Sequence, residues 1–206
     1  MLKIILNEFH INGYTTIDEE NDIVFLKHNE YNDFWIISQK PFDLSSQSEL
    51  YEQYISKFAT EYPFVKRNTS LIILTFKDAL TLEDIVSIEN DPYLFKKYVL
   101  SYSQDSLEKL KSILFAEDGS FSPIETMMIK PEVFAHLKDE ISEGPYHLLY
   151  SIAHKLPILP VNVSHEDIIE INLNLDEEQR NCLEWCNRLF EDGVEIEAAI
   201  EKFSKE

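Results

Sequence analysis

Short apolar runs separated by polar loops predict a sheet in the first hundred residues. Residues 23–27 (IVFLK), 34–38 (FWIIS) and 71–76 (LIILTF) have the length and the β-branched or aromatic content of strands. The run FWII has no polar alternation, which is typical of a strand that is buried on both sides. We therefore expect other elements to cover both faces of this strand.

The N-terminal segment is interpreted as more β-structure. Residues 2–11 (LKIILNEFHI) predict a strand, Asn12-Gly13 a turn, and residues 14–17 a short returning partner. A polar loop is expected over residues 18–22, before the next strand begins. These segments would extend the sheet toward the N-terminus.

Two helices are predicted between the strands. Residues 44–62 repeat apolar positions at helical spacing, and either Ser45 or Ser46 can cap the first turn. Thr81, with Asp84 three residues later, predicts the start of a second helix. The buried face of the second helix is expected to consist of Leu82, Ile85, Val86 and Ile88.

The segment NDPYLFKKYVLSY follows this helix and predicts an aromatic strand over residues 93–99. The strand follows Asp91-Pro92, where the aspartate is expected to form a turn. Because successive strand residues face opposite sides, Lys96 and Lys97 must point in different directions. Tyrosines beside charged residues are typical of protein interfaces. We therefore predict an interaction surface at Tyr93, Phe95, Lys96, Lys97, Tyr98 and Tyr102.

The second half of the chain has a helical pattern. Ser103 is expected to cap one helix, and Pro123, Pro131 and Gly144-Pro145 mark the starts of three more. Farther on, a strand is predicted over residues 168–173, and Asp176 caps a long helix.

These elements predict an α+β fold. A mixed or antiparallel sheet with two helices is expected over residues 1–102, and a mainly helical region over residues 103–206. The two regions are expected to pack together as one unit.

The charge of the chain excludes some functions. The net charge is −20, and residues 161–206 alone hold 13 acidic and 4 basic residues. Since phosphate binding depends on clustered Lys and Arg, direct binding of nucleic acid is not expected. The four glycines are isolated, and neither GxGxxG nor GxxxxGK[ST] occurs, so no nucleotide cofactor is expected.

The location predicted from the sequence is the cytoplasm. The N-terminus is apolar for only a few residues, unlike a signal peptide, and no apolar run is long enough for a membrane span. Cys182 and Cys186 are four residues apart in a helical pattern, which suits two reduced thiols in a buried helix face.

Residue spacing does not indicate a metal or a nucleophile. Cys182 and Cys186 form no CxxC pair, and HExxH is absent. His147 and His154 are two helical turns apart, too far to bind one ion together. No GxSxG motif presents a serine. We therefore expect no cofactor, no metal site and no catalytic residue.

One segment resembles a known family. NTSLIILTFK, followed by IENDPYLFKKYVLSYSQDSLEKLK, is similar to the middle component of bacterial ABC-three-component conflict systems, and FWIIS upstream also fits. The resemblance covers about residues 20–170 and is strongest over residues 68–112. The chain is also similar to the small accessory subunit of Lamassu-type antiphage systems.

The resemblance implies a non-enzymatic subunit of a DNA-sensing defence complex. Its expected partners are an ABC- or SMC-like ATPase and an effector, often a nuclease. The lack of nucleotide and metal motifs, the acidity and the interface-type aromatic residues agree with such an adaptor.

Two other functions are considered. A small metal-dependent hydrolase or degenerate nuclease would use Asp91 and Lys96, although their spacing does not match the acidic pair and acid-x-lysine strand of such enzymes. An acidic inhibitor that mimics DNA would present the carboxylates after residue 160 to a basic DNA-binding protein.

Overall fold

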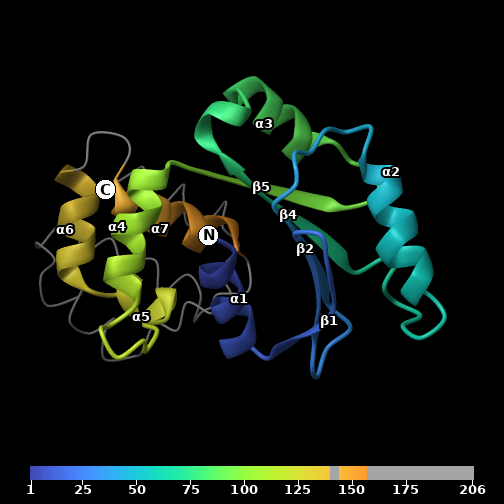
Figure 1. Ribbon diagram of the computed structural model, residues 1–206, viewed down its shortest axis with the longest axis horizontal. Helices are drawn as coiled ribbons and strands as arrows, with labels where there is room; N and C mark the ends of the chain where they lie inside the picture. Colours follow the sequence, from blue (N-terminus) through green and yellow to red (C-terminus); the bar gives the residue numbers. More distant parts are fainter. Residues whose placement is uncertain (140–143, 157–206) are drawn as a thin grey trace, which may run out of the picture. The chain divides into compact units, whose positions relative to one another are not determined.

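A five-stranded sheet organises the described part of the chain, residues 1–139 and 144–156 of this computed structural model (Figure 1). These residues all belong to one unit of the chain, Met1–Pro160. The strands, in spatial order, are β1 (Tyr14–Glu20), β2 (Ile23–His28), β3 (Phe34–Ser38), β4 (Thr69–Phe76) and β5 (Lys96–Tyr102). The first three strands are antiparallel, whereas β4 is parallel to β3 and β5 is parallel to β4.

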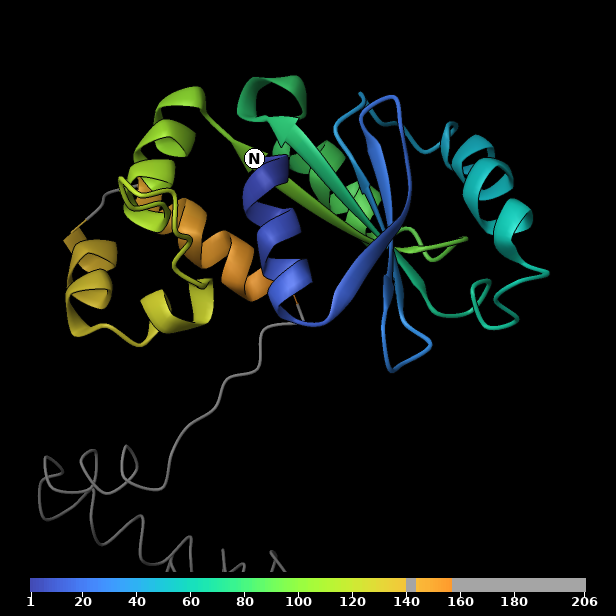
Figure 2. The ribbon, with the colours of Figure 1, turned by 60° about the horizontal axis from the view of Figure 1, so that its bottom comes forward.

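The connections between the parallel strands form one helical layer. α2 (Gln47–Leu50) continues as the π-helical segment η1 (Tyr51–Ser56) between β3 and β4. The short 3-10 turn η2 (Lys77–Ala79) and α3 (Leu82–Asn90) connect β4 to β5. Because such crossovers are right-handed and β3, β4 and β5 follow in spatial order, both connections cover the same face, which we call the α3 face. Figure 2 shows α1 and α2 on opposite sides of the sheet.

The other face of the sheet, the α1 face, is covered by helices from both ends of the described chain. Apolar side chains of these helices form one buried cluster with Val24, Ile37 and Leu100 of the sheet. The helices are α1 (Leu2–Ile11), α4 (Gln104–Leu114), α5 (Ile124–Met128), α6 (Pro131–Asp139) and α7 (Pro145–Lys155). The sheet is thus the middle of three layers (Figures 1 and 2).

The central strands are buried on both faces. All five residues of β3 are buried, with Trp35 in the cluster of the α1 face and Ile36 in the cluster of the α3 face. The strands predicted from residues 23–27, 34–38 and 71–76 are confirmed as β2, β3 and β4. The absence of polar alternation in FWII therefore indicates two-sided burial correctly.

The strand predicted over residues 2–11 is wrong, because this segment is the helix α1. Ile4, Ile5 and Phe9 are completely buried, and only helical periodicity brings residues one and four positions apart to one side. The predicted turn at Asn12-Gly13 is the end of this helix. Gly13 has a φ of +83°, and a Cβ there would lie 3.2 Å from Nε2 of His28, so the position requires glycine.

The polar loop predicted over residues 18–22 is shorter in the structure. β1 continues to Glu20, and only Asn21 and Asp22 form the turn, with φ of 50° and 67°. Two residues with positive φ suit a two-residue hairpin turn, and Asn and Asp are favoured there. The pairing with β2 shifts between Thr16 and Asp18, and this bulge interrupts the alternation from which a longer strand could be predicted.

The helix predicted over residues 44–62 is present as α2 and η1, beginning at Gln47. Ser46 stands at the cap position, but its side chain makes no cap hydrogen bond. The carboxylate of Asp43 instead accepts hydrogen bonds from the N–H groups of Ser45 (2.7 Å) and Ser46 (3.0 Å). The first turn is therefore supported by a residue that lies before the two predicted caps.

The start of α3 is confirmed, but half of its predicted buried face is wrong. Thr81 and Asp84 form a reciprocal capping box. Ile88 is buried and Ile85 is half-buried, whereas Leu82 and Val86 are 77% and 48% exposed. α3 packs mainly on β5, an edge strand, so only a narrow stripe of the helix meets the sheet.

The helix starts predicted in the second half are confirmed within the described residues. Ser103 forms a capping box with Ser106, and Pro145 occupies the first turn of α7 after Gly144. α5 follows Pro123, and α6 begins at Pro131. No helix in this part of the chain is long and apolar enough to span a bilayer.

The α+β class is confirmed by the mixed sheet and the helices that follow it. The predicted strand over residues 168–173, the helix starting at Asp176 and the two cysteines lie outside the described residues. The division at residue 102 stays a prediction.

Helix α1 places a carboxyl group in the interior. Glu8 is fully buried, and its Oε1 accepts a 2.6 Å hydrogen bond from the N–H of Ile124, at the start of α5. Oε2 of Glu8 has no partner among the described residues. Burial raises the pKa of this carboxyl, the Ile124 hydrogen bond opposes the shift, and the charge of Glu125 adds to it.

The raised pKa of Glu8 predicts that stability depends on pH. Because the folded state holds the proton more tightly than the unfolded chain, folding takes up a proton between the two pKa values. The free energy of unfolding should therefore fall as the pH rises from the ordinary value of 4.5 through the raised folded value. In Glu8→Gln this fall should disappear, as measured by urea unfolding at a series of pH values.

Glu19→Gln is the control for this experiment, since Glu19 is exposed on β1. It should keep the wild-type pH profile. An unchanged profile in Glu8→Gln would contradict the raised pKa of the buried carboxyl.

Candidate functional site

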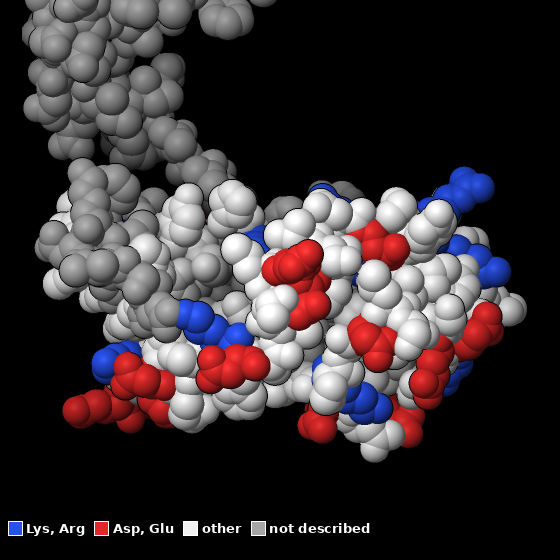
Figure 3. Space-filling view, turned by 90° about the horizontal axis from the view of Figure 1, so that it is seen from above, with Lys and Arg blue, Asp and Glu red and all other residues white. Residues whose placement is uncertain are grey.

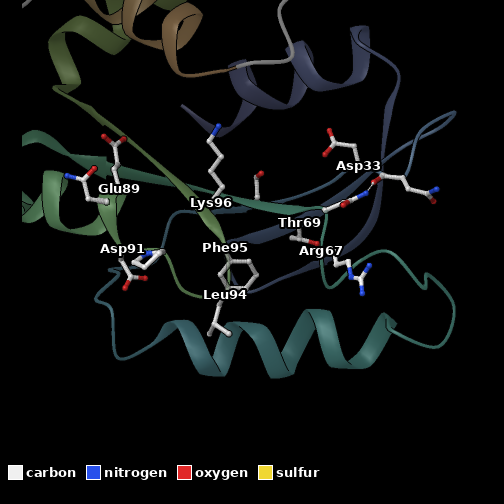
Figure 4. Close-up of a pocket in the computed structure, with 13 residues that line it drawn as sticks. Asp33, Arg67, Thr69, Glu89, Asp91, Leu94, Phe95 and Lys96 are labelled. Carbon is white, nitrogen blue, oxygen red and sulfur yellow. Dashed lines mark hydrogen bonds between the residues drawn. The ribbon is translucent and has the colours of Figure 1, made fainter.

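One cavity lies at the amino ends of the three parallel strands. Its volume is about 760 Å³, and we call it the strand-start hollow (Figure 4). Three loops surround it, one before each of β3, β4 and β5. It is lined by Asn32, Asp33, Arg67, Asn68, Thr69, Ser70, Glu89, Asn90, Asp91, Pro92, Leu94, Phe95 and Lys96.

Hydrogen bonds hold Asp33 at the edge of the hollow that lies before β3. Oδ2 of Asp33 accepts one bond from the hydroxyl of Tyr14 and another, of 3.0 Å, from Nε1 of Trp35. The pKa of Tyr14 is raised, first by burial and then by its bond to Asp33. The neighbouring loops are joined by a 2.6 Å bond from Nδ2 of Asn68 to the carbonyl of Asn32. This side of the hollow is therefore positioned by interactions within the protein.

Lys97 organises the opposite side of the hollow, residues 91–95, which we call the Asp-Pro loop. Its side chain is 0% exposed, and Nζ lies 2.6 Å from Oδ2 of Asp91. The same ammonium donates to the carbonyls of Tyr93 (2.6 Å) and Phe95 (3.1 Å). The hydrogen bond from Lys97 lowers the pKa of Asp91, and the N–H of Tyr93 contributes to the shift. One buried cation thus determines the course of the whole loop.

The Asp-Pro loop presents apolar side chains to the surface. Tyr93 is 68% exposed and Leu94 is 42% exposed. Leu94 has a φ of +63°, a left-handed conformation that a leucine rarely adopts, so the Lys97 network holds the backbone in a strained state. In Figure 4 Leu94 points toward the α2 helix, whereas Lys96 points to the other side of the strand.

Three of the six predicted interface residues are accessible in the structure. Tyr93 and Lys96 are exposed, and Tyr98 is half-buried. Phe95, Lys97 and Tyr102 are buried, so they support the surface from inside and are not available to a partner. Lys96 and Lys97 do face opposite sides of β5, as their positions in a strand require. The interface itself stays a prediction.

Lys96 and Tyr98 lie together on the α1 face of β5. Nζ of Lys96 is 5.1 Å from the centre of the Tyr98 ring, a cation–π distance. The Tyr98 ring in turn packs on Trp35, with 5.5 Å between ring centres. Lys96 is thus aligned at the hollow by an aromatic contact.

The free edge of β5 is closed by an ion pair that the sequence does not indicate. Oε1 of Glu89, on α3, accepts a 2.8 Å hydrogen bond from the N–H of Val99 and lies 2.7 Å from Nζ of Lys155, on α7. Nζ of Lys155 also donates to the carbonyl of Val99 (2.8 Å). The side chains of Glu89 and Lys155 thereby occupy the N–H and the carbonyl of Val99, which a further strand would need for pairing. The residues are 66 positions apart in sequence, so no local pattern joins them.

The hollow suits polar recognition. Its charged residues are three acids, Asp33, Glu89 and Asp91, and two bases, Arg67 and Lys96. The carboxylates of Asp33 and Asp91 are already bonded to protein groups. Among the described residues, no group of three His, Cys, Asp or Glu is arranged to hold a metal ion.

His147 and His154 both lie on α7, as predicted.

The two adjacent lysines of β5 provide a matched test of the loop. Lys97→Met removes a buried ammonium and leaves Asp91 and two carbonyls without their donor, so it should reduce the free energy of unfolding by about 3 kcal/mol. Lys96→Met is the control, and it should change that free energy by no more than about 0.5 kcal/mol because Lys96 is exposed. Urea unfolding measures both values, and equal effects would contradict the role of Lys97.

A comparison with family models finds one match. Residues 33–121 match the model MComp1, which is described as ABC-three component (ABC-3C) system Middle Component 1. This segment contains α3 and every residue that lines the strand-start hollow except Asn32. Neither the search of curated proteins nor the search of solved structures finds a match. Residues 33–121 of this chain are therefore similar to ABC-three component system Middle Component 1, the family that the sequence resemblance indicates.

Proposed function

We propose that this protein is a non-catalytic adaptor of an ABC-three-component defence system. It docks onto an ABC- or SMC-like ATPase and restrains an effector, expected to be a nuclease, until foreign or broken DNA is sensed. The observation that carries the proposal is the match of residues 33–121 to a family whose name describes a middle component. A middle component works with the other components of its system.

The strand-start hollow supports this role. Its residues are positioned by internal hydrogen bonds, which reduces the cost of ordering them when a partner binds. The hollow contains the exposed Leu94 and the bases Arg67 and Lys96, and the Asp-Pro loop beside it adds the exposed Tyr93. Tyrosine and arginine are enriched at the centres of protein interfaces. We propose that the hollow and the Asp-Pro loop contact one of the other components.

The alternatives stay hypotheses. The acidic residues that would mimic DNA lie after residue 160, outside the described structure. Asp91, which a hydrolase would use, is bound to Lys97, and Lys96 faces the other side of the strand. The similarity to the Lamassu accessory subunit also stays a prediction.

Co-expression tests the adaptor role. The chain is produced together with the ATPase and the effector encoded beside it, and the mixture is separated by size-exclusion chromatography. We expect the three proteins to elute together and the effector to cleave DNA more slowly in the complex than alone. Separate elution of all three would contradict the proposal.

The double variant Tyr93→Ala with Leu94→Asn tests the contact surface. Both side chains are exposed, and asparagine tolerates the positive φ at position 94, so the fold should persist. Loss of these two side chains should raise the protein concentration needed for co-elution at least tenfold. This change corresponds to about 1.4 kcal/mol of binding free energy. Tyr150→Ala, at an exposed tyrosine of α7, should co-elute like the wild type. If the double variant also co-elutes normally, the Asp-Pro loop is not the contact.

A further inference from the structure

The outer side of α3 has exposed apolar side chains. Leu82 and Val86 are four positions apart, on one side of the helix, and are 77% and 48% exposed. The helix is held in place without them, by its capping box at Thr81 and by the buried Ile88. Leu82 and Val86 therefore contribute little to folding, and they are available for contact with a partner protein.

The surface around these two side chains is acidic. Residues 78–95 contain no Lys or Arg, and they contain the five acids Asp78, Glu83, Asp84, Glu89 and Asp91. Figure 3 looks at the molecule from the side on which α3 lies and shows acidic side chains among uncharged ones, with Lys or Arg side chains elsewhere on the same face. A negative field around an apolar stripe attracts positive charge.

The cations of β5 and α7 do not remove this acidity, whereas Lys77, on η2, directly precedes the acidic segment. Lys97 is buried and pairs with Asp91, and Lys96 points to the α1 face. Lys155 pairs with Glu89 at the free edge of β5. The exposed carboxylates of Glu83 and Asp84 lie on the same helix as Leu82 and Val86, and among the described residues Asp84 is bonded to its own cap, Thr81.

We propose that the outer side of α3 binds a basic amphipathic helix of another protein. Leu82 and Val86 would pack on the apolar stripe of that helix, and its Lys or Arg residues would lie beside Glu83 and Asp84. The spacing of four residues matches the spacing of anchors on a facing helix. Leu82, Glu83, Asp84 and Val86 do not line the strand-start hollow, and the inference holds whether or not the adaptor role is correct.

The test uses the full chain and two synthetic peptides of fourteen residues. The first repeats Leu and Lys at helical spacing, and the second has Glu at each Lys position. Binding is measured by fluorescence anisotropy at about 0.15 M salt, where charges on exposed groups are screened beyond about 8 Å. We expect the basic peptide to bind and the acidic peptide not to bind.

Variants locate the binding site. Leu82→Ser with Val86→Ser removes the stripe without changing the charge and should weaken binding at least tenfold. Ile129→Ser, at a residue that is 73% exposed outside α3, is the matched apolar control and should bind like the wild type. Glu83→Lys should also weaken binding, whereas Glu52→Lys, at an exposed acid of η1, should have a much smaller effect.

These outcomes separate a specific site from general attraction to an acidic chain. Equal weakening by Ile129→Ser, equal effects of Glu83→Lys and Glu52→Lys, or no binding to the wild type would overturn the proposal. Each variant is checked by thermal unfolding. Glu83→Lys alone decides the question if the double serine variant does not fold, because position 83 is exposed and its side chain is not the cap.

Discussion

Two-sided burial of the central strands is the constraint on which the described structure depends. β2, β3 and β4 are apolar on both faces, so the chain must supply a helical layer for each face. The crossovers α2 and α3 cover one face, and α1 with the later helices covers the other. Because both faces are then occupied, the ends of the strands and the outer sides of the helices are the surfaces left for binding.

The strand-start hollow shows how one buried charge can shape such a surface. Lys97 satisfies Asp91 and the carbonyls of the loop before β5, and it holds Leu94 in a left-handed conformation. The result is a loop that is held by hydrogen bonds and has exposed side chains, Tyr93 and Leu94, at its tip. Asp33, bound by Tyr14 and Trp35, positions the other side. A surface that is organised before a partner arrives loses less conformational entropy on binding, which agrees with the proposed adaptor role.

The edge strand β5 and the outer side of α3 differ in how accessible they are to a partner. The ion pair of Glu89 and Lys155 occupies the N–H and the carbonyl of Val99 on β5, which makes addition of a strand less favourable there. The outer side of α3 has no such protection, since Leu82 and Val86 are exposed among carboxylates. On this side of the sheet, α3 therefore offers side chains for contact, whereas the edge of β5 does not offer the backbone groups of Val99.

Local patterns were enough to predict much of this protein. Apolar runs indicate β2, β3 and β4, and the capping residues Thr81 and Ser103 indicate two helix starts, because each signal involves neighbouring residues. The segment around the Asp-Pro loop also carries the family resemblance. The N-terminal helix was missed, since its apolar residues support both a strand and a helix when no partner surface is known.

Contacts between distant residues decided the rest. The packing of α2, α3 and β4 around β5 decides which of Tyr93, Phe95 and Lys97 faces solvent. The spacing of residues within the segment does not reveal this packing. The same holds for Glu8 beneath α5, 116 residues away, and for the Glu89–Lys155 pair. Residue type and periodicity determine which elements can form, whereas burial and electrostatic partners arise only when those elements meet.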